Sequence, residues 1–421
     1  MSATYKHQRL PMKFRDYQKK IITLGTEVIR DKGVLYLAME VRTGKTLTAL
    51  GICEMLTTNN VLFITKKKAI SSINYDYHML SPDFNIEVIN YESLHKHTIR
   101  DVDMMICDEA HSMGAFARPS KRAKMVKELL IKHDCPLMLL SGTPTPESFS
   151  QIYHQLYGHP RNPFYSYKNF YSWANDYVRV TQKMISGNRI NDYSNGIESK
   201  IKLAIQPYFI TYTQKDAGFQ TVIDEEILEV QMSPLTYRLC TQLKKDLVIK
   251  GKDQLLLADT GVKLMQKLHQ LYSGTVIFES GDSKVLDTTK ARFIKSKFRN
   301  SKIAIFYKFK AELTALQEAY EGELTTDLQE FKDTYKHIAL QIVSGREGIS
   351  LQEADYLVYY NIDFSATSYW QSRDRMSTQT RLNNKIYWIF SNNGIEKRIY
   401  KAVNGKKNYT LSHFKKDLLS L

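Results

Sequence analysis

The chain has 421 residues, of which 43% are hydrophobic and 24% charged, enough for about two or three ordinary domains. No apolar run reaches the ~18 residues of a membrane-spanning helix, and the first residues lack the apolar stretch of a secretory signal. The four scattered cysteines lack the paired spacing of a zinc site, which argues for reduced thiols in a cytoplasmic protein. The net charge of +15 suits a polyanionic partner such as nucleic acid, although a merely basic enzyme would also carry it.

The first informative stretch is a predicted buried strand, GVLYLA at 33–38, followed by MEVRTGKT at 39–46 and then by apolar residues at helical spacing. A strand, a tight turn and a helix start present backbone N–H groups and the positive end of a helix to an anion. In such a phosphate loop Lys45 reaches the β and γ phosphates of a nucleotide, and the Thr46 hydroxyl holds Mg²⁺. The pattern expects a small residue where Met39 stands, so an ordinary helix start is the alternative interpretation of this stretch.

A second motif, MMICDEAH at 104–111, is an apolar run that ends in two adjacent carboxylates. At the carboxyl end of a parallel strand, Asp108 would contribute to a Mg²⁺ shell, and Glu109 would orient and deprotonate an attacking water. A solvated acidic strand end is the alternative, and it is disfavoured because the motif follows the Gly-Lys-Thr turn in the same predicted sheet.

Short apolar runs alternate with amphipathic stretches along most of the chain, which predicts α/β lobes with mostly parallel sheets flanked by helices. Strands are predicted at 34–38, 60–65, 86–91, 103–109, 135–143, 302–307, 337–342, 355–361 and 385–390, and a helix at 121–133. The aromatic and polar stretch 146–220 is interpreted as helices and loops, and 235–272 as helical. We therefore expect two lobes, 1–224 with the ATP site and 225–421, each with helical elaborations.

Several stretches, in order, resemble the motifs of superfamily 2 helicases and translocases, and most closely those of their Swi/Snf-type branch. The stretches that carry this resemblance are FRDYQKKI (14–21), MEVRTGKT, VLFITKKKAISSINYDY (61–77), VINYESL (88–94), the DEAH box, LLSGTPTPES (139–148), SGREGISLQEAD (344–355) and YWQSRDRM (369–376). The resemblance implies two RecA-like lobes, and in this branch the early small residue of the phosphate loop is also replaced, which removes the objection raised by Met39.

The resemblance also implies a role for each matching residue. It assigns nucleotide binding to Gln18, Arg42, Thr43, Gly44, Lys45, Thr46 and Gly348, Mg²⁺ to Thr46 and Asp108, and catalysis to Lys45, Asp108, Glu109, Gln371 and Arg375. It assigns nucleic-acid contact to Lys66, Lys67 and Ser344, and coupling between the ATP site and the track to His111, Ser141, Gly142 and Thr143.

One departure concerns the last motif, which usually offers two arginines three residues apart. Arg375 holds the first position, but Thr378 holds the second, and Arg373 and Arg381 are the nearby alternatives. If 365–377 is a helix, Gln371 and Arg375 share one face of it, which favours Arg375 as the arginine that reaches the γ-phosphate.

The implied function is a nucleic-acid-stimulated ATPase that uses ATP and Mg²⁺ and translocates along duplex or branched DNA, single strands included. Compact, phage-like members suggest unwinding or remodelling of branched DNA in replication or recombination, in the cytoplasm of a bacterium or a phage-infected host. An RNA helicase on the same fold is one alternative, and a non-catalytic, ATP-switched nucleic-acid-binding scaffold is another. No inserted wedge for strand separation is evident, and the sequence says nothing of protein partners.

Overall fold

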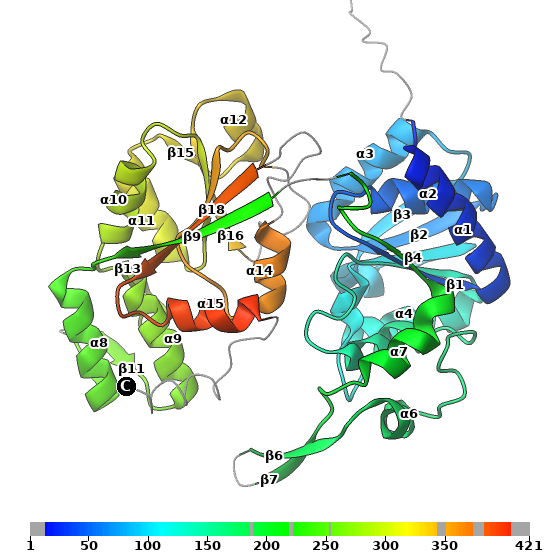
Figure 1. Cartoon of the computed structure of the whole chain (residues 1–421), viewed down its shortest axis with the longest axis horizontal. Helices are drawn as coiled ribbons and strands as arrows, with labels where there is room; N and C mark the ends of the chain where they lie inside the picture. The colour runs from blue at the N-terminus through cyan, green and yellow to red at the C-terminus, as the bar shows by residue number, and fades with distance from the viewer. Residues whose placement is uncertain are drawn as a thin grey trace, which may run out of the picture. The chain divides into compact units, whose positions relative to one another are not determined.

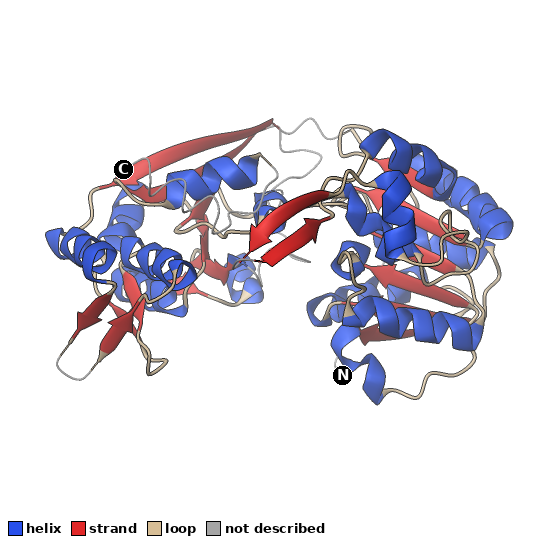
Figure 2. Cartoon of the chain, turned by 90° about the horizontal axis from the view of Figure 1, so that it is seen from below, coloured by secondary structure: helices blue, strands red, loops and turns tan. Residues whose placement is uncertain are grey.

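The computed structural model describes residues 13–185, 188–218, 222–251, 254–342, 351–373 and 383–405. They form two compact units, Met1–Gly218 and Phe219–Leu421, hereafter unit 1 and unit 2. The boundary expected between 224 and 225 falls within strand β9 (Val222–Val230). Each unit is a six-stranded sheet covered by helices on both faces, which confirms the expected α/β class (Figures 1 and 2).

All strand pairs of the unit 1 sheet are parallel, in the order β3-β2-β4-β5-β1-β8. The inner strands are buried on both faces, and for this reason their sequences are continuous apolar runs rather than alternating ones. The five predicted runs of this lobe are confirmed as β1 to β5, whereas β8 at the sheet edge was not predicted. The strands are β1 (Val34–Met39), β2 (Asn60–Thr65), β3 (Asn85–Asn90), β4 (Met104–Asp108), β5 (Leu137–Leu140) and β8 (Phe209–Tyr212).

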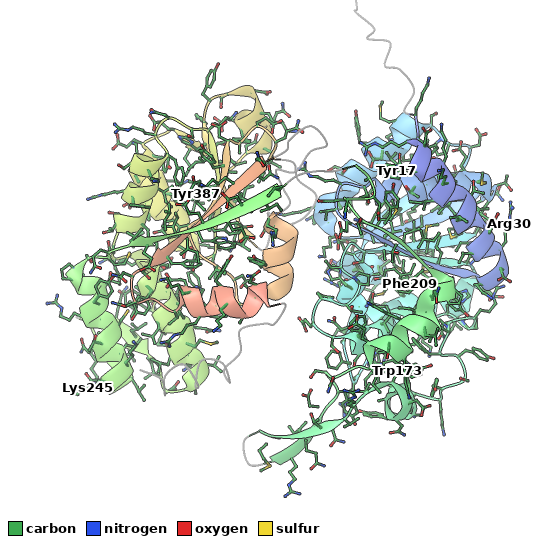
Figure 3. All side chains as sticks on the ribbon, viewed as in Figure 1. Tyr17, Arg30, Trp173, Phe209, Lys245 and Tyr387 are labelled. Carbon is green, nitrogen blue, oxygen red and sulfur yellow. The ribbon has the colours of Figure 1, made fainter. Side chains whose placement is uncertain are left out.

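Two apolar clusters attach the helices of unit 1 to the two faces of this sheet. On one face lie α1 (Asp16–Lys32), α2 (Lys45–Met55) and α3 (Ile70–Leu80), and on the other α4 (Lys121–His133), α5 (Ile152–Leu156), α6 (Phe170–Tyr177) and α7 (Glu198–Ile205). Trp173 of α6 is fully buried in the cluster that holds α4 to α7 against the sheet (Figure 3). Short 3₁₀ turns connect these elements: η1 (Lys67–Ala69), η2 (Tyr91–Lys96), η3 (Ala110–Met113), η4 (Phe149–Gln151) and η5 (Gln206–Tyr208).

The expectation of only helices and loops over 146–220 was wrong, because this stretch also contains an antiparallel hairpin. Strand β6 (Thr181–Ile185) pairs with β7 (Asn188–Asp192), so that Met184 lies opposite Arg189. Figure 1 shows the hairpin extending away from the sheet of unit 1, beyond α6. Met184 and Ile190, on opposite faces of the ribbon, are both exposed, and a strand without a buried face lacks the alternation that reveals strands in a sequence.

The unit 2 sheet is also parallel, in the order β15-β16-β14-β17-β18-β9. The four predicted runs of this lobe are confirmed as β14, β16, β17 and β18. The sheet strands are β9, β14 (Ile303–Tyr307), β15 (Leu324–Thr325), β16 (His337–Gln341), β17 (Tyr356–Tyr359) and β18 (Asn383–Ser391). The stretch 235–272 is not continuously helical, because a small hairpin of β10 (Val248–Lys250) and β11 (Leu255–Leu257) divides it. A second small hairpin follows, β12 (Thr275–Ile277) with β13 (Ser283–Val285).

The helices of unit 2 again divide between two apolar clusters. One cluster contains residues of α8 (Pro234–Asp246), α9 (Gly261–Tyr272), α12 (Leu328–Asp333), α14 (Ala366–Arg373) and α15 (Glu396–Asn404), and the other residues of α10 (Thr289–Lys297) and α11 (Lys310–Tyr320). Across the described ranges, no helix has both the length and the hydropathy that a membrane crossing requires.

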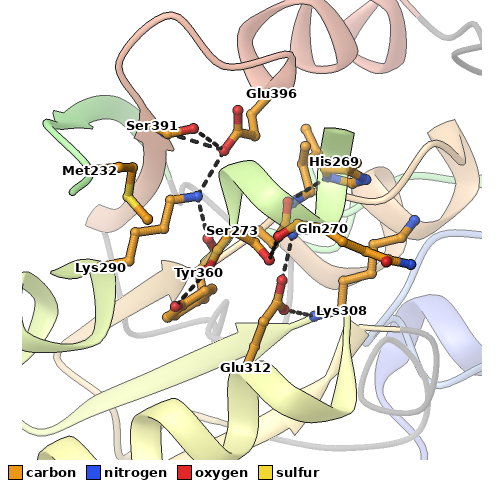
Figure 4. A network of polar contacts seen from close by, with 12 residues as sticks. Met232, His269, Gln270, Ser273, Lys290, Lys308, Glu312, Tyr360, Ser391 and Glu396 are labelled. Carbon is orange, nitrogen blue, oxygen red and sulfur yellow. Dashed lines mark hydrogen bonds and ion pairs between the residues drawn. The ribbon is translucent and has the colours of Figure 1, made fainter. Parts of the chain in front are cut away.

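A buried ion pair crosses the core of unit 2 (Figure 4). Lys290 of α10 and Glu396 of α15 are both fully buried, and Nζ lies 2.8 Å from Oε1. The same ammonium donates to the Tyr360 carbonyl oxygen at 3.4 Å, and the same carboxylate oxygen accepts from the Ser391 hydroxyl at 2.8 Å. Removing one partner leaves the other as a buried charge without compensation, which costs far more than the pair contributes when both are present.

A second polar contact in the same region joins three further elements. The Asn361 amide donates to Glu312 of α11 at 2.6 Å, and its oxygen lies 2.6 Å from Nε2 of His269 in α9. Burial lowers the pKa of His269 well below its usual range and raises the pKa of Glu312. The imidazole is therefore neutral at physiological pH, and its interaction with Asn361 does not depend on charge.

We predict that Lys290→Ala costs about 3–5 kcal/mol of stability, because it leaves Glu396 buried and unpaired. For a unit of this size that corresponds to roughly 10 °C in the melting temperature, measured by calorimetry of the full chain. The control is Lys263→Ala, which breaks an exposed pair with Asp259 and should leave the melting temperature nearly unchanged. Equal melting temperatures for the two variants would contradict the proposed contribution of the buried pair.

Candidate active site

The turn between β1 and α2 has the backbone of a phosphate loop. Arg42 and Gly44 both lie in the left-handed region, with φ of 64° and 81°. Gly44 is the N-cap residue of α2, and within the described ranges no side chain caps it, so the first N–H groups of the helix stay available to an anion. The Lys45 ammonium donates to the Glu40 carbonyl oxygen at 3.3 Å, which places it over the loop.

Gly44 is favoured by its left-handed φ, and its Cα lies against the Gln18 side chain. A Cβ at this position would lie 2.5 Å from Nε2 of Gln18, which itself is 3% exposed. Nε2 donates to the Gly44 carbonyl oxygen at 3.3 Å, and Oε1 accepts from the Arg15 N–H at 2.9 Å. Gln18 is thus turned toward the phosphate loop, and contact with a base would require it to exchange one of these bonds.

The structure brings the two predicted acids to the same edge of the sheet as the loop. Asp108 ends β4, and its Oδ2 accepts from the Thr65 hydroxyl at 2.8 Å, at the end of neighbouring β2. Burial, and then the adjacent Glu109 carboxylate, raise the pKa of Asp108 to about 6, while the Thr65 hydroxyl and the Lys45 ammonium act in the opposite direction. An acid buried in this way is stabilised in its ionised form by a nearby cation.

The residues fit a Mg²⁺ ion bound together with a nucleotide. Mg²⁺ is usually held by one or two carboxylates plus substrate phosphates, not by an all-protein cage. Asp108 offers the carboxylate, and Thr46, the second residue of α2, offers the hydroxyl. In the described ranges no group of three or more His, Cys, Asp or Glu side chains is placed to hold a metal, so substrate oxygens would have to complete the shell.

Glu109 is held by a chain of polar contacts that continues into the coupling motif. Its backbone is left-handed, with φ of 50°, and Oε2 lies 3.3 Å from Nδ1 of His111. The same Nδ1 lies 2.9 Å from the Ser141 hydroxyl oxygen, which accepts from the Thr143 N–H at 3.1 Å. Oγ1 of Thr143 is buried and, considering only described residues, has no hydrogen-bond partner, so a hydroxyl is available here to a ligand or water.

Gly142 brings the backbone of the coupling motif against the phosphate loop. A Cβ here would lie 3.3 Å from the Met39 carbonyl oxygen and 3.4 Å from the Val41 nitrogen. Any side chain would therefore press on the loop, so the close contact between the two motifs favours glycine at position 142.

Several residues at this site were not predicted from the sequence, among them Thr65 beside Asp108. Tyr17 donates its hydroxyl to the Thr43 carbonyl oxygen at 3.0 Å and stacks on Tyr212, with ring centroids 4.6 Å apart (Figure 3 labels Tyr17). The Gln214 N–H donates to the Glu40 carboxylate at 2.7 Å. The available signals were the position of Tyr17 beside Gln18 and a polar segment directly after the apolar run that forms β8.

The predicted track residues of unit 1 lie at the same edge. Lys66 and Lys67 follow Thr65, whose hydroxyl contacts Asp108, and Lys67 is exposed whereas Lys66 is half-buried. The remaining predictions belong to unit 2, where Ser344, Gly348, Arg375, Thr378 and Arg381 lie outside the described residues, as does the side chain of Gln371 on α14.

Arg373, one of the alternative arginines, is described and is already engaged within unit 2. Its Nη2 lies 2.9 Å from the Glu225 carboxylate of β9, and the guanidinium lies over the ring of Tyr369. A catalytic role for Arg373 would require this ion pair to break.

Comparison with known proteins gives one family match. The sequence model of the SNF2-related domain matches residues 57–272, more than half of the chain. Two solved structures of the Sulfolobus solfataricus SWI2/SNF2 ATPase core are similar. The first, in complex with dsDNA, has 13% identity and a TM-score of 0.43, with 94% of this chain and 92% of that chain covered. The second, of the core domain, has 15% identity and a TM-score of 0.43, with 96% and 92% covered. No curated protein matches the sequence.

We predict that Gly44→Ala lowers the affinity for a fluorescent ATP analogue at least tenfold, because the new methyl group displaces the Gln18 side chain and strains the left-handed backbone of the loop. The matched control is Gly281→Ala, at φ 90° with nothing within 4 Å of its Cβ. Both substitutions should cost about 1–2 kcal/mol of stability for the left-handed backbone. If Gly281→Ala lowered nucleotide affinity equally, the effect would be one of stability and not of the loop.

Proposed function

This chain belongs to the SNF2-related domain family, and from that premise we propose that it is an ATPase that is stimulated by nucleic acid and translocates along DNA. The supporting observation is the gathering of the phosphate loop, the partly buried Asp108 and the Glu109–His111–Ser141 contacts at one edge of the unit 1 sheet. A structural acidic strand end would not need a partly buried carboxylate close to the Lys45 ammonium and an uncapped helix start.

In this proposal each residue acts through the position that the fold gives it. Lys45 and the N–H groups at the start of α2 bind the phosphates of ATP. Asp108 and Thr46 hold Mg²⁺, which supplies neutralisation of phosphate charge when bound. Glu109 orients a water molecule and accepts its proton, while the contact with His111 keeps the carboxylate at the edge of the sheet.

DNA as the track is supported by the net charge of +15 and by the position of Lys66 and Lys67 at the same edge as the acids. Contacts to phosphates do not distinguish DNA from RNA. The choice of duplex or branched DNA, and of a role in its remodelling during replication or recombination, therefore rests on the resemblance to compact phage-encoded members. The assignment of DNA as the track is tested by measuring ATPase rates with duplex DNA, single-stranded DNA and RNA. Stimulation by RNA alone would reject this assignment.

We predict that Glu109→Gln retains ATP binding but lowers kcat by at least a hundredfold, because the amide keeps the shape of the side chain and cannot accept the proton. Lys45→Ala should instead abolish ATP binding, because the loop loses its positioned ammonium. The measurements are ATP affinity and steady-state hydrolysis at saturating DNA. Glu87→Gln on the edge strand β3 is the control for the same change of charge and should leave both unchanged. Normal turnover in Glu109→Gln would remove this residue from the role of base.

We predict that replacing Lys66 and Lys67 together by Ala makes the salt dependence of duplex binding less steep. Each lost phosphate contact lowers the slope of log K against log salt by about 0.9, so two contacts give about 1.8. Lys244→Ala with Lys245→Ala on α8 removes the same charge from unit 2 and is the control (Figure 3 labels Lys245). An unchanged slope in the Lys66 and Lys67 variant would place the track elsewhere.

A further inference from the structure

A hollow of about 700 Å³ lies in unit 1 between the β6–β7 hairpin and the loop that follows η3. Its volume falls within the ~300–1,000 Å³ typical of ligand pockets. Three aromatic residues, Phe116, Tyr171 and Tyr193, and two arginines, Arg118 and Arg189, contribute to its lining. Residues of the phosphate loop and the Asp108–Glu109 pair do not line it, so it is separate from the candidate ATP site.

The aromatic side of the hollow is fixed to the core. The ring of Tyr193 meets Phe170 edge-on with centroids 5.4 Å apart, and meets Tyr171 at 5.8 Å. Phe170 is buried in the cluster that also contains Trp173. Tyr171, in contrast, is 48% exposed. Its ring therefore faces solvent, while its neighbours Phe170 and Tyr193 hold it against the core. A ring held in this way can stack on an unpaired base without first being ordered.

The charged side of the hollow suits phosphate groups. Arg118 and Arg189 are both exposed, and within the described parts of the chain the structure gives neither of them an acidic partner. The acidic side chain in the lining is Asp192, which accepts from the N–H and the hydroxyl of Ser194 at 3.1 and 3.0 Å. The lining therefore has a net positive charge, and a guanidinium binds phosphate oxygens through two parallel hydrogen bonds.

The base of the hairpin is tied to the segment that continues from the coupling motif. The Ser148 hydroxyl donates to the Ser194 carbonyl oxygen at 2.7 Å, and the Ser150 hydroxyl donates to the Tyr193 carbonyl oxygen at 2.6 Å. A two-stranded ribbon is marginally stable alone, so these bonds and the Val178–Gly196 bridge hold it in place. The hairpin that lines the hollow is thus anchored to Ser148 and Ser150, only a few residues after the motif at Ser141 to Thr143.

We propose that this hollow binds an unpaired DNA strand, with a base stacked on Tyr171 and backbone phosphates on Arg118 and Arg189. This inference rests on the proposed function in one respect, namely that DNA is the nucleic acid that the protein binds. An unpaired strand fits better than a duplex, because base faces are exposed for stacking only when the bases are unpaired.

The test measures binding of the full chain to a fluorescent oligothymidine of about 16 nucleotides and to a blunt duplex, by anisotropy without nucleotide. Tyr171→Ala should weaken binding of the single strand about tenfold. Arg118→Ala with Arg189→Ala should lower the single-strand salt slope by about 1.4, for two contacts at about 0.7 each. Duplex affinity and duplex-stimulated ATPase activity should stay within about twofold of wild type for all variants.

Two controls match these changes in residue type. Tyr165→Ala removes a tyrosine that is 74% exposed elsewhere on unit 1, and Arg30→Ala with Arg100→Ala removes two exposed arginines that do not line the hollow. Wild-type affinity for the single strand in the Tyr171 and double-arginine variants would overturn the inference, as would an equal loss of strand and duplex binding. A wild-type protein that binds the strand through these residues but shows no DNA-stimulated ATPase would instead overturn the proposed function.

Discussion

The site depends on one constraint, the parallel alignment of the strands in the unit 1 sheet. Because β1, β2, β4 and β5 run in the same direction, all of their carboxyl ends meet at one edge. Thr65 and Asp108 are the last residues of β2 and β4, Lys45 and Ser141 follow β1 and β5, and this edge brings all four together. The same geometry directs the start of α2 toward that edge, so the positive end of the helix and the partly buried acids Asp108 and Glu109 lie at the same edge of the sheet.

Burial determines how the polar groups behave in both units. At the sheet edge of unit 1, burial raises the pKa of Asp108, which makes the site favourable for a cation. Inside unit 2, burial isolates Lys290 and Glu396 from water, and each charge depends on the other. In both places burial makes the charged form of a side chain less favourable. At the sheet edge of unit 1 a bound ligand can offset this cost, whereas inside unit 2 the partner side chain must do so.

The sequence predicts what is buried much better than what is exposed. The runs that form β1 to β5 and β14 to β18 are recognisable, except for the short edge strand β15, because most of them are inner parallel strands that are apolar on both faces. The helix over 121–133 matches α4 residue for residue because its apolar spacing and its Ser120 cap coincide. Hairpin β6–β7 has no buried face, and the orientation of Gln18 depends on a distant glycine, so neither leaves a local pattern.

The His111 ring connects the parts of unit 1 more closely than motif order suggests. One nitrogen, Nδ1, lies within reach of both the Glu109 carboxylate and the Ser141 hydroxyl, and it carries at most one proton. A change in the hydrogen bonding of Glu109 therefore alters the bond available to Ser141. The segment that begins at Ser141 abuts the phosphate loop through Gly142 and anchors the hairpin through Ser148. A shift of this segment would therefore change contacts both at the phosphate loop and at the hollow beside the hairpin.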